Sequence, residues 1–206
     1  MLSIIDKLDG GSIVTAQNEQ QSIALKEWAV SVKALAEGQQ IIVMRKGGII
    51  EETRDFQLIS PSFYLMPAYE HQKKHLLKEQ YVDGLEETLA NWSIDMETIK
   101  LEAYAEVVED IEVTDQETLD RLRDLHIWTD TFAEERLRWK KTKPLHVLLL
   151  RVYRLETPLE ISMRPAYNGC KSWVRMEDEI QSPKMLPVLD EETFLSEVQK
   201  IKNELA

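Results

Sequence analysis

The residues that first suggest chemistry stand between two β-branched runs, in the segment Arg45-Lys46-Gly47-Gly48. Two glycines fit the tight turn of a β-hairpin and let the backbone approach a ligand closely. Two adjacent cations, one with the forked donors of a guanidinium, suit a phosphate group. The segment is therefore a candidate anion-binding turn, with a solvated turn of ordinary surface charge as the alternative. It is not a Walker A loop, because GxxxxGK followed by Ser or Thr occurs nowhere.

A second cluster, Tyr69-Glu70-His71-Gln72, places a carboxylate beside an imidazole. Glu70 and His71 are the candidate catalytic pair, because these groups exchange protons near neutral pH, and Gln72 is a candidate ligand contact. His75 would share a helix face with His71, but the spacing is not HExxH and a third ligand is missing. No metal site is predicted. A polar helix start with exposed histidines is the simpler interpretation.

A third cluster lies at a turn late in the chain and reads Gly169-Cys170-Lys171-Ser172-Trp173. Lys171 and Ser172 could contact an anion while Trp173 stacks on a base. A thiol nucleophile at Cys170 is also considered, since the neighbouring cation would lower the thiol pKa. A tight hairpin whose tryptophan fills the core explains the same residues without a ligand.

Two further groups receive an ordinary structural interpretation. Lys26 and Glu27 are expected on a helix surface, and Trp28 is expected in the core. The densest basic run surrounds Trp139 and resembles a surface for stacking and phosphate contacts. Cations are also common at the C-terminal end of a helix, where they complement its dipole, and this is the simpler explanation. That run comprises Arg136, Arg138, Lys140, Lys141 and Lys143.

The 206-residue chain is acidic overall, with 37 Asp and Glu against 25 Lys and Arg, a net charge of −12. Because phosphate contacts dominate non-specific affinity for nucleic acid, a protein that coats DNA is disfavoured, while a local basic site stays open. The single cysteine excludes an intrachain disulfide and fits a reducing cytosol. The run Val147 to Leu150 is too short to cross a bilayer, and the first residues lack a secretory pattern. We therefore expect a cytoplasmic protein without a membrane partner.

Hydrophobic periodicity and turn residues divide the chain into helices and strands. Helices are predicted over residues 23–36, 68–80, 84–98, 114–125, 130–139 and 190–201. Strands are predicted over residues 40–45, 55–59, 62–66, 98–108, 145–155, 159–163 and 172–176. Regular βαβα alternation is missing, which argues against a doubly wound parallel sheet. The prediction is one α+β domain over 22–206, after a loose lead-in over 1–21. Its sheet is mostly antiparallel, with barrel-like closure considered, and carries flanking helices and an acidic helical insertion over about 84–140.

Five ordered segments, spread from about Ile23 to Met176, together resemble one bacterial family. They are Ala24-Leu25-Lys26-Glu27-Trp28, Arg45-Lys46-Gly47-Gly48-Ile49, Pro67-Ala68-Tyr69-Glu70-His71-Gln72, Arg151-Val152-Tyr153-Arg154-Leu155 and Gly169-Cys170-Lys171-Ser172-Trp173. The chain resembles the family catalogued as domain of unknown function 1802, although Ala68 stands where Thr is more usual. The resemblance implies a bacterial, cytosolic, single-domain protein and no established activity. The expected architecture is also similar to small β-barrels that bind RNA, an analogy that does not fix function.

The leading hypothesis is a binding module for nucleic acid or a nucleotide, acting through a local basic site on an acidic body. Its proposed phosphate contacts are Arg45, Lys46, Arg151 and Lys171, and its proposed base contacts are His71, Gln72 and Trp173. One alternative is an enzyme that acts on a phosphodiester or nucleotide through Glu70 and His71. Another is an adaptor that binds a protein through the acidic region 86–135. No cofactor is indicated. The binding hypothesis requires Arg45, His71 and Lys171 to lie on one side of the fold.

Overall fold

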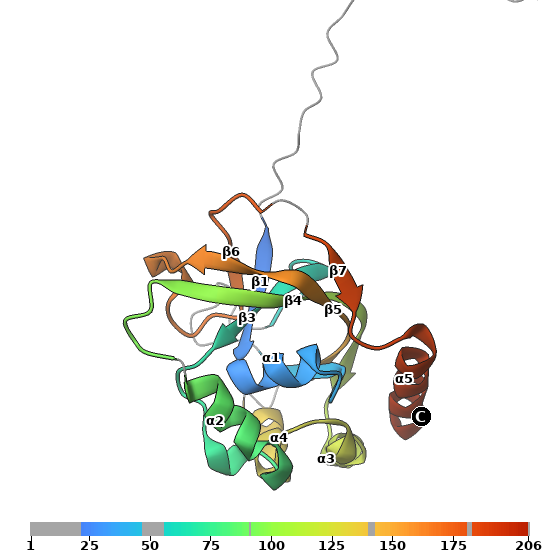
Figure 1. The fold of residues 1–206 in the computed structure, drawn as a ribbon. Helices are drawn as coiled ribbons and strands as arrows, with labels where there is room; N and C mark the ends of the chain where they lie inside the picture. The colour runs from blue at the N-terminus through green and yellow to red at the C-terminus, as the bar shows by residue number, and fades with distance from the viewer. Residues whose placement is uncertain (1–21, 47–55, 91, 140–142, 181–182, 206) are drawn as a thin grey trace, which may run out of the picture.

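A mostly antiparallel sheet organises the computed structural model, which describes residues 22–46, 56–90, 92–139, 143–180 and 183–205 (Figure 1). The strand order is β2-β5-β4-β3-β1-β6, and β7 pairs with β5 beside this path. Only β1 and β3 are parallel neighbours. The seven strands are β1 (Ile23–Trp28), β2 (Ile42–Arg45), β3 (Ser62–Ala68), β4 (Thr98–Val113), β5 (Leu145–Ser162), β6 (Trp173–Arg175) and β7 (Met185–Pro187).

The sheet is open, and the barrel-like closure that we considered is not supported. Within the described ranges, β2 and β6 end the strand path and do not pair with each other. Two irregularities in the long β4–β5 ladder supply curvature instead, since a bulge bends a strand and increases its twist. At one of them Glu102 of β4 faces the four residues 155–158 of β5. The two strands predicted over 145–155 and 159–163 are therefore one long strand with an irregularity between them, which also accommodates Pro158, a residue that cannot donate to the ladder.

Five α-helices pack against this sheet in the described part of the chain. They are α1 (Ala29–Ala36), α2 (Val82–Ala90), α3 (Gln116–Arg121), α4 (Asp130–Arg138) and α5 (Glu191–Leu205). Figure 1 shows α1 to α4 below β4 and β5, and α5 at the right-hand side. The largest apolar cluster joins these helices to β2 and β5, through residues such as Val30, Leu85, Leu119, Phe132, Leu149 and Phe194. The predicted α+β class is confirmed. The range 84–140 also contains β4, which lies between β3 and β5 within the sheet. No helix within the described ranges is long and apolar enough to cross a membrane.

The helix predicted over residues 23–36 is wrong in its first half, where the chain forms β1. Ala24 and Leu25 are fully buried, and β1 lies between β3 and β6. An inner strand covered on both faces carries a continuous apolar run, so its sequence does not alternate as an edge strand does. Periodicity alone cannot separate such a run from one face of a helix. The element changes type at Trp28, which has extended backbone angles and precedes the first residue of α1.

The helix predicted over residues 68–80 is also wrong. After β3 the chain turns at His71, whose φ of 64° is incompatible with an α-helix. Two short 3₁₀ helices follow, η1 (Lys74–Leu76) and η2 (Glu79–Tyr81). Two more occur later in the chain, η3 (Arg123–Leu125) and η4 (Pro165–Tyr167). The strand expected over 55–59 is not formed by its described residues 56–59.

Candidate anion-binding pocket

A pocket of about 460 Å³ lies where five separate segments of the chain meet. The segments are the end of β1, the end of β2, the turn after β3, helix α4 and the turn before β6. The polar groups that line it are Lys26, Glu27, Arg45, Glu70, His71, Lys73, Glu135, Arg136, Cys170, Lys171 and Ser172. Five of these side chains are Lys or Arg and three are Glu, so the pocket carries two more positive than negative charges, before any charge on His71, in a chain of net charge −12.

The sheet topology explains why these segments converge. Because β1 and β3 are parallel, Trp28 and Ala68 pair at their C-terminal ends, and the following turn with His71 lies at the same edge. Strand β6 is antiparallel to β1, so its N-terminal end comes to this edge as well, where the Lys26 N–H donates to the Ser172 carbonyl (2.8 Å). The pocket therefore brings Arg45, Glu70, His71, Lys171 and Ser172 together, as the binding hypothesis requires.

Arg45 is held by a nearly buried network. Its Nη1 donates to Glu27 Oε2 (3.1 Å) and to the Lys26 carbonyl (3.3 Å), and its Nη2 donates to the Ser172 hydroxyl. The Arg45 side chain is 11% exposed and that of Glu27 is 7% exposed. Glu27 Oε1 also accepts from the Trp28 N–H (2.8 Å), so the carboxylate is fully engaged. The network fixes one guanidinium at the pocket wall together with its own counterion.

Two lysines border the pocket on its β6 side. Lys26 Nζ donates to the carbonyls of Tyr167 (2.9 Å) and Gly169 (3.0 Å), which leaves one of its three N–H groups for a ligand. Burial lowers the Lys26 pKa from its ordinary value, Glu70 opposes this shift, and Lys171 adds to it. Lys171 Nζ donates to the carbonyl of Ala166. Both ammonium groups therefore have fixed positions and spare donors.

Arg136 is a pocket cation without a carboxylate partner of its own among the described residues. Its guanidinium lies over the Phe132 ring, 5.0 Å from the centroid, and no carboxylate of the described segments forms an ion pair with it. Burial lowers the Arg136 pKa from its ordinary value, Arg45 lowers it further, and Glu27 raises it. Since Glu27 is already paired with Arg45, two guanidiniums share one carboxylate here. An anion entering the pocket would relieve this imbalance.

Aromatic side chains form the apolar wall of the pocket. Trp28 and Phe132 line it with ring centroids 5.9 Å apart, and Trp28 packs edge-on against Trp128 (4.9 Å). Trp139, just beyond the last residue of α4, also lines it and is 39% exposed. A ligand that combines an anionic group with a flat ring can contact both kinds of surface.

Four residues proposed as ligand contacts lie elsewhere or have structural partners. Lys46 is 2% exposed, and its Nζ donates to the Leu137 carbonyl in the last turn of α4. Arg151 pairs with Glu191 (3.2 Å), and its guanidinium lies over the Phe194 ring. These two cations therefore contact α4 and α5, and their role as ligand contacts stays a prediction.

Trp173 and Gln72 also contact other parts of the fold. Trp173 packs against Phe56 and Phe63, and its Nε1 donates to the Gln57 carbonyl (2.8 Å), so this partly buried ring covers one side of a core cluster. Gln72 accepts from the Val30 N–H (3.0 Å) through Oε1 and donates to the Tyr69 carbonyl through Nε2 (3.2 Å). None of these four lines the pocket. Gly47 and Gly48 lie outside the described residues.

Sequence reasoning gave structural roles to several residues that line the pocket. Lys26 and Trp28 were expected on a helix, where positions two apart face different ways, whereas on a strand they share one face. Arg136 and Trp139 belong to the basic run that was explained as a helix end. In both segments the sequence places cations near a tryptophan, which is typical of a site for a phosphate and a base. The sequence does not show that the two segments lie next to each other in the fold.

The fold and the pocket define an α+β protein with a locally cationic, aromatic-walled pocket at one edge of its sheet. Residues 24–200 match the family described as domain of unknown function (DUF1802), and the chain belongs to this family. The fold is similar to the crystal structure of ASCH from Zymomonas mobilis, at 12% identity and a TM-score of 0.44, covering 89% of this chain and 94% of that chain. Two mutants of that protein give TM-scores of 0.44 and 0.43, also at 12% identity, covering 90% and 89% of this chain and 96% and 98% of theirs. A comparison with curated proteins gives no match.

Proposed function

We propose that this protein binds a nucleotide or a short stretch of nucleic acid in the pocket. Phosphate contacts Arg136, with Arg45 and Lys171 adjoining, and a base lies against the wall formed by Trp28 and Trp139. The bacterial, cytoplasmic setting expected from the sequence is part of this proposal. The support comes from the residues of the pocket rather than from the similar structures.

The observation that carries the proposal is the unbalanced charge at Arg136. A half-buried guanidinium beside Arg45, with the nearby carboxylate of Glu27 already engaged, favours an anion of matching geometry. Phosphate offers oxygens that a guanidinium contacts in a bidentate way. The excess of positive charge is local, which is compatible with an acidic protein that does not bind nucleic acid over its whole surface.

The aromatic wall favours a nucleotide over inorganic phosphate. Every base has a flat face, and stacking on tryptophan or tyrosine tolerates different bases. Trp139 lines the pocket and is 39% exposed. The pocket volume of about 460 Å³ lies within the range of ordinary small-molecule sites.

The test is a fluorescence-anisotropy titration with labelled single-stranded RNA, single-stranded DNA and duplex DNA at low salt. Binding should weaken as salt rises, with a slope of about 0.7 per single-strand phosphate contacted. Arg136→Ala should weaken binding about tenfold and reduce this slope, since it removes one phosphate contact. Arg138→Ala is the matched control, because Arg138 is on the same helix, is exposed and pairs with Glu134. No binding to any probe, or equal losses in the two variants, would refute the proposal.

The second candidate function is an enzyme that acts on a phosphodiester or nucleotide. Glu70 and His71 both line the pocket, and the φ of 64° at His71 is uncommon for a residue with a side chain. Cleavage of the same probes, with and without magnesium, tests it. His71→Asn should abolish cleavage while binding survives, since Asn tolerates the same backbone conformation. The control is His75→Asn, which alters an exposed histidine outside the pocket.

A further inference from the structure

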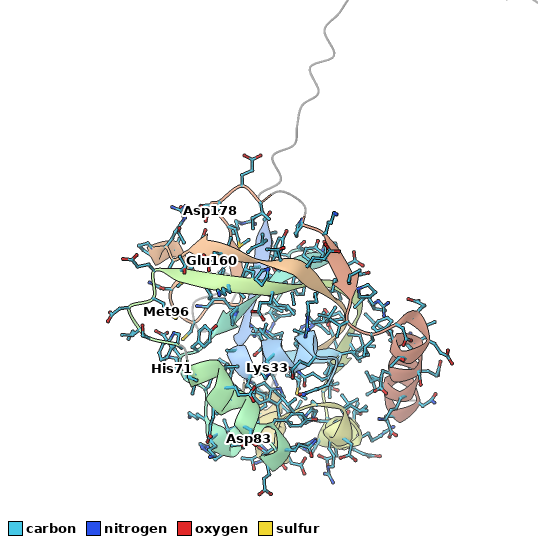
Figure 2. The ribbon with its side chains drawn as sticks, in the orientation of Figure 1. Lys33, His71, Asp83, Met96, Glu160 and Asp178 are labelled. Carbon is cyan, nitrogen blue, oxygen red and sulfur yellow. The ribbon has the colours of Figure 1, made fainter. Side chains whose placement is uncertain are left out.

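A second, smaller hollow of about 90 Å³ adjoins the first pocket. The two share Lys26, Ala68 and Glu70, so they form neighbouring parts of one surface depression. The second hollow is bordered by the turn after β3 and by the segment 92–97 that leads into β4. Figure 2 labels one residue from each part, His71 and Met96, on the same side of the molecule, with Met96 nearer β4.

The second hollow is bordered by exposed apolar and aromatic side chains. Ile94 is 77% exposed and Met96 is 37% exposed, although both are large hydrophobic residues. Trp92 stacks on Tyr69, with ring centroids 5.9 Å apart and an interplanar angle of 14°. Exposed apolar side chains gathered around a hollow are typical of a surface that contacts a ligand. Trp92 is only partly buried, so it can offer a platform for a flat ring.

Lys26 lies at the boundary between the two hollows. It lines both of them, and two of its three N–H groups are engaged with the carbonyls of Tyr167 and Gly169. Its remaining donor can contact one anionic oxygen. A single cation between two aromatic-walled hollows suits a phosphate that links two bases. Glu70, the other charged group on the boundary, is exposed and would repel that phosphate, which sets a limit on the affinity.

We propose that the two hollows bind two consecutive nucleotides of a single strand. The base of the first lies against Trp28 and Trp139, the linking phosphate contacts Lys26, and the second base lies on Trp92 beside Ile94. This inference rests on the proposed function and names its ligand as an unpaired oligonucleotide rather than a free mononucleotide. A duplex is disfavoured, because paired bases cannot present their faces to two separate aromatic walls.

Isothermal titration calorimetry with three defined ligands tests the second hollow. The ligands are uridine 5′-monophosphate, uridine 3′,5′-bisphosphate and the dinucleotide pUpU. The bisphosphate carries the second phosphate without a second base, so it controls for charge. The full-length protein should bind pUpU about tenfold more tightly than the bisphosphate, equivalent to about 1.4 kcal/mol and within the range of one stacked base.

Substitutions in the second hollow should remove this difference and nothing else. Trp92→Ala should make pUpU bind no more tightly than the bisphosphate, while affinity for the monophosphate stays within about twofold. Ile94→Ala, at a residue too exposed to affect folding strongly, should reduce the tenfold difference to about threefold. Leu186→Ala is the matched control, because Leu186 is 60% exposed on β7 and lines neither hollow.

The possible results separate this inference from the proposed function. Equal affinities for pUpU and the bisphosphate in the unaltered protein would overturn the second base site and leave the first intact. A tenfold difference that persists in both Trp92→Ala and Ile94→Ala would also overturn it. Failure of all three ligands and of a labelled hexauridylate to bind would overturn the proposed function, and this inference with it.

Discussion

Gln72, in the turn after β3, accepts a hydrogen bond from the backbone N–H of Val30 in the first turn of α1 (3.0 Å). Helix α1 begins at Ala29, and the residue before it, Trp28, has no side chain that can cap the helix. The amide of Gln72 therefore supplies the cap from a distant part of the chain. Because Gln72 follows His71 directly, the same contact ties the turn that borders the pocket to the start of α1.

Gln72→Ala should destabilise the protein by about 1 kcal/mol, the usual cost of losing a helix cap. Gln72→Glu should recover most of the loss, because a carboxylate also accepts from the helix N-terminus and complements its dipole. Urea unfolding measures both changes. The control is Gln80→Ala, at an exposed residue of η2 that lies outside the pocket. If Gln72→Ala leaves the free energy of unfolding unchanged, the cap does not contribute to stability.

The sequence selected candidate ligand contacts by residue type, whereas the contacts of each side chain in the fold depend on distant segments of the chain. Arg45 and Lys171 were selected because cations beside small turn residues suit anions, and both line the pocket. Lys46 has the same type and follows the last residue of β2, but its side chain is buried and donates to the Leu137 carbonyl of α4. Trp173 is a ring that either a base or the core could engage, and Phe56 and Phe63 pack against it in the core. Only the contacts formed by distant segments distinguish such cases.

The secondary-structure predictions also succeeded for some elements and failed for others. The strand at 145–155 and the helix at 130–139 were predicted because β-branched runs and capped, amphipathic segments are local signals. The strand β1 was missed because its apolar run is set by two neighbouring strands, and the turn at His71 was missed because its backbone conformation is unusual for histidine. Both of these mispredicted segments are among the five that line the pocket.

Lys46 should behave as a structural residue. Lys46→Met keeps much of the side-chain volume but leaves the Leu137 carbonyl without its donor, so the protein should lose about 1–3 kcal/mol of stability. The salt dependence of nucleic-acid binding should keep its slope, because no phosphate contact is removed. Anisotropy titrations at several salt concentrations check this. A slope reduced as far as that of Arg136→Ala would return Lys46 to the set of phosphate contacts.

Glu27→Gln should lower the stability of the protein and raise its affinity for a phosphate ligand. Glu27→Gln removes the counterion of Arg45, and a nearly buried charge left unpaired costs about 3–5 kcal/mol. The same change leaves Arg45 and Arg136 with no shared carboxylate, so a phosphate ligand should bind more tightly. Unfolding measurements with and without uridine 5′-monophosphate test both effects. Arg45→Ala is a poor probe of the ligand site by comparison, because it leaves Glu27 buried and unpaired and so perturbs the fold.

His126 should make the protein sensitive to acid. The side chain is 3% exposed, its Nδ1 accepts from the Trp128 N–H (3.2 Å), and its Nε2 has no hydrogen-bond partner among the described residues. Burial lowers the His126 pKa from 6.5 to about 4, Lys78 adds to the shift, and Asp124 opposes it. Between these two pH values the unfolded chain binds a proton that the folded chain does not. The stabilising contribution of the neutral ring is therefore fully present above pH 6.5 and is lost as the pH falls towards 4.

The size of this loss follows from the shift of about 2.5 pH units, from 6.5 to about 4, which corresponds to roughly 3 kcal/mol. His126→Asn keeps an oxygen that can accept from the N–H two residues on but cannot titrate in this range. The difference in unfolding free energy between the two proteins, measured in urea from pH 7 to pH 4.5, should shift by about 2–3 kcal/mol in favour of the variant. His75→Asn, at an exposed histidine, should show no such shift. Parallel pH profiles for the original protein and His126→Asn would show that a buried neutral imidazole does not set the acid sensitivity.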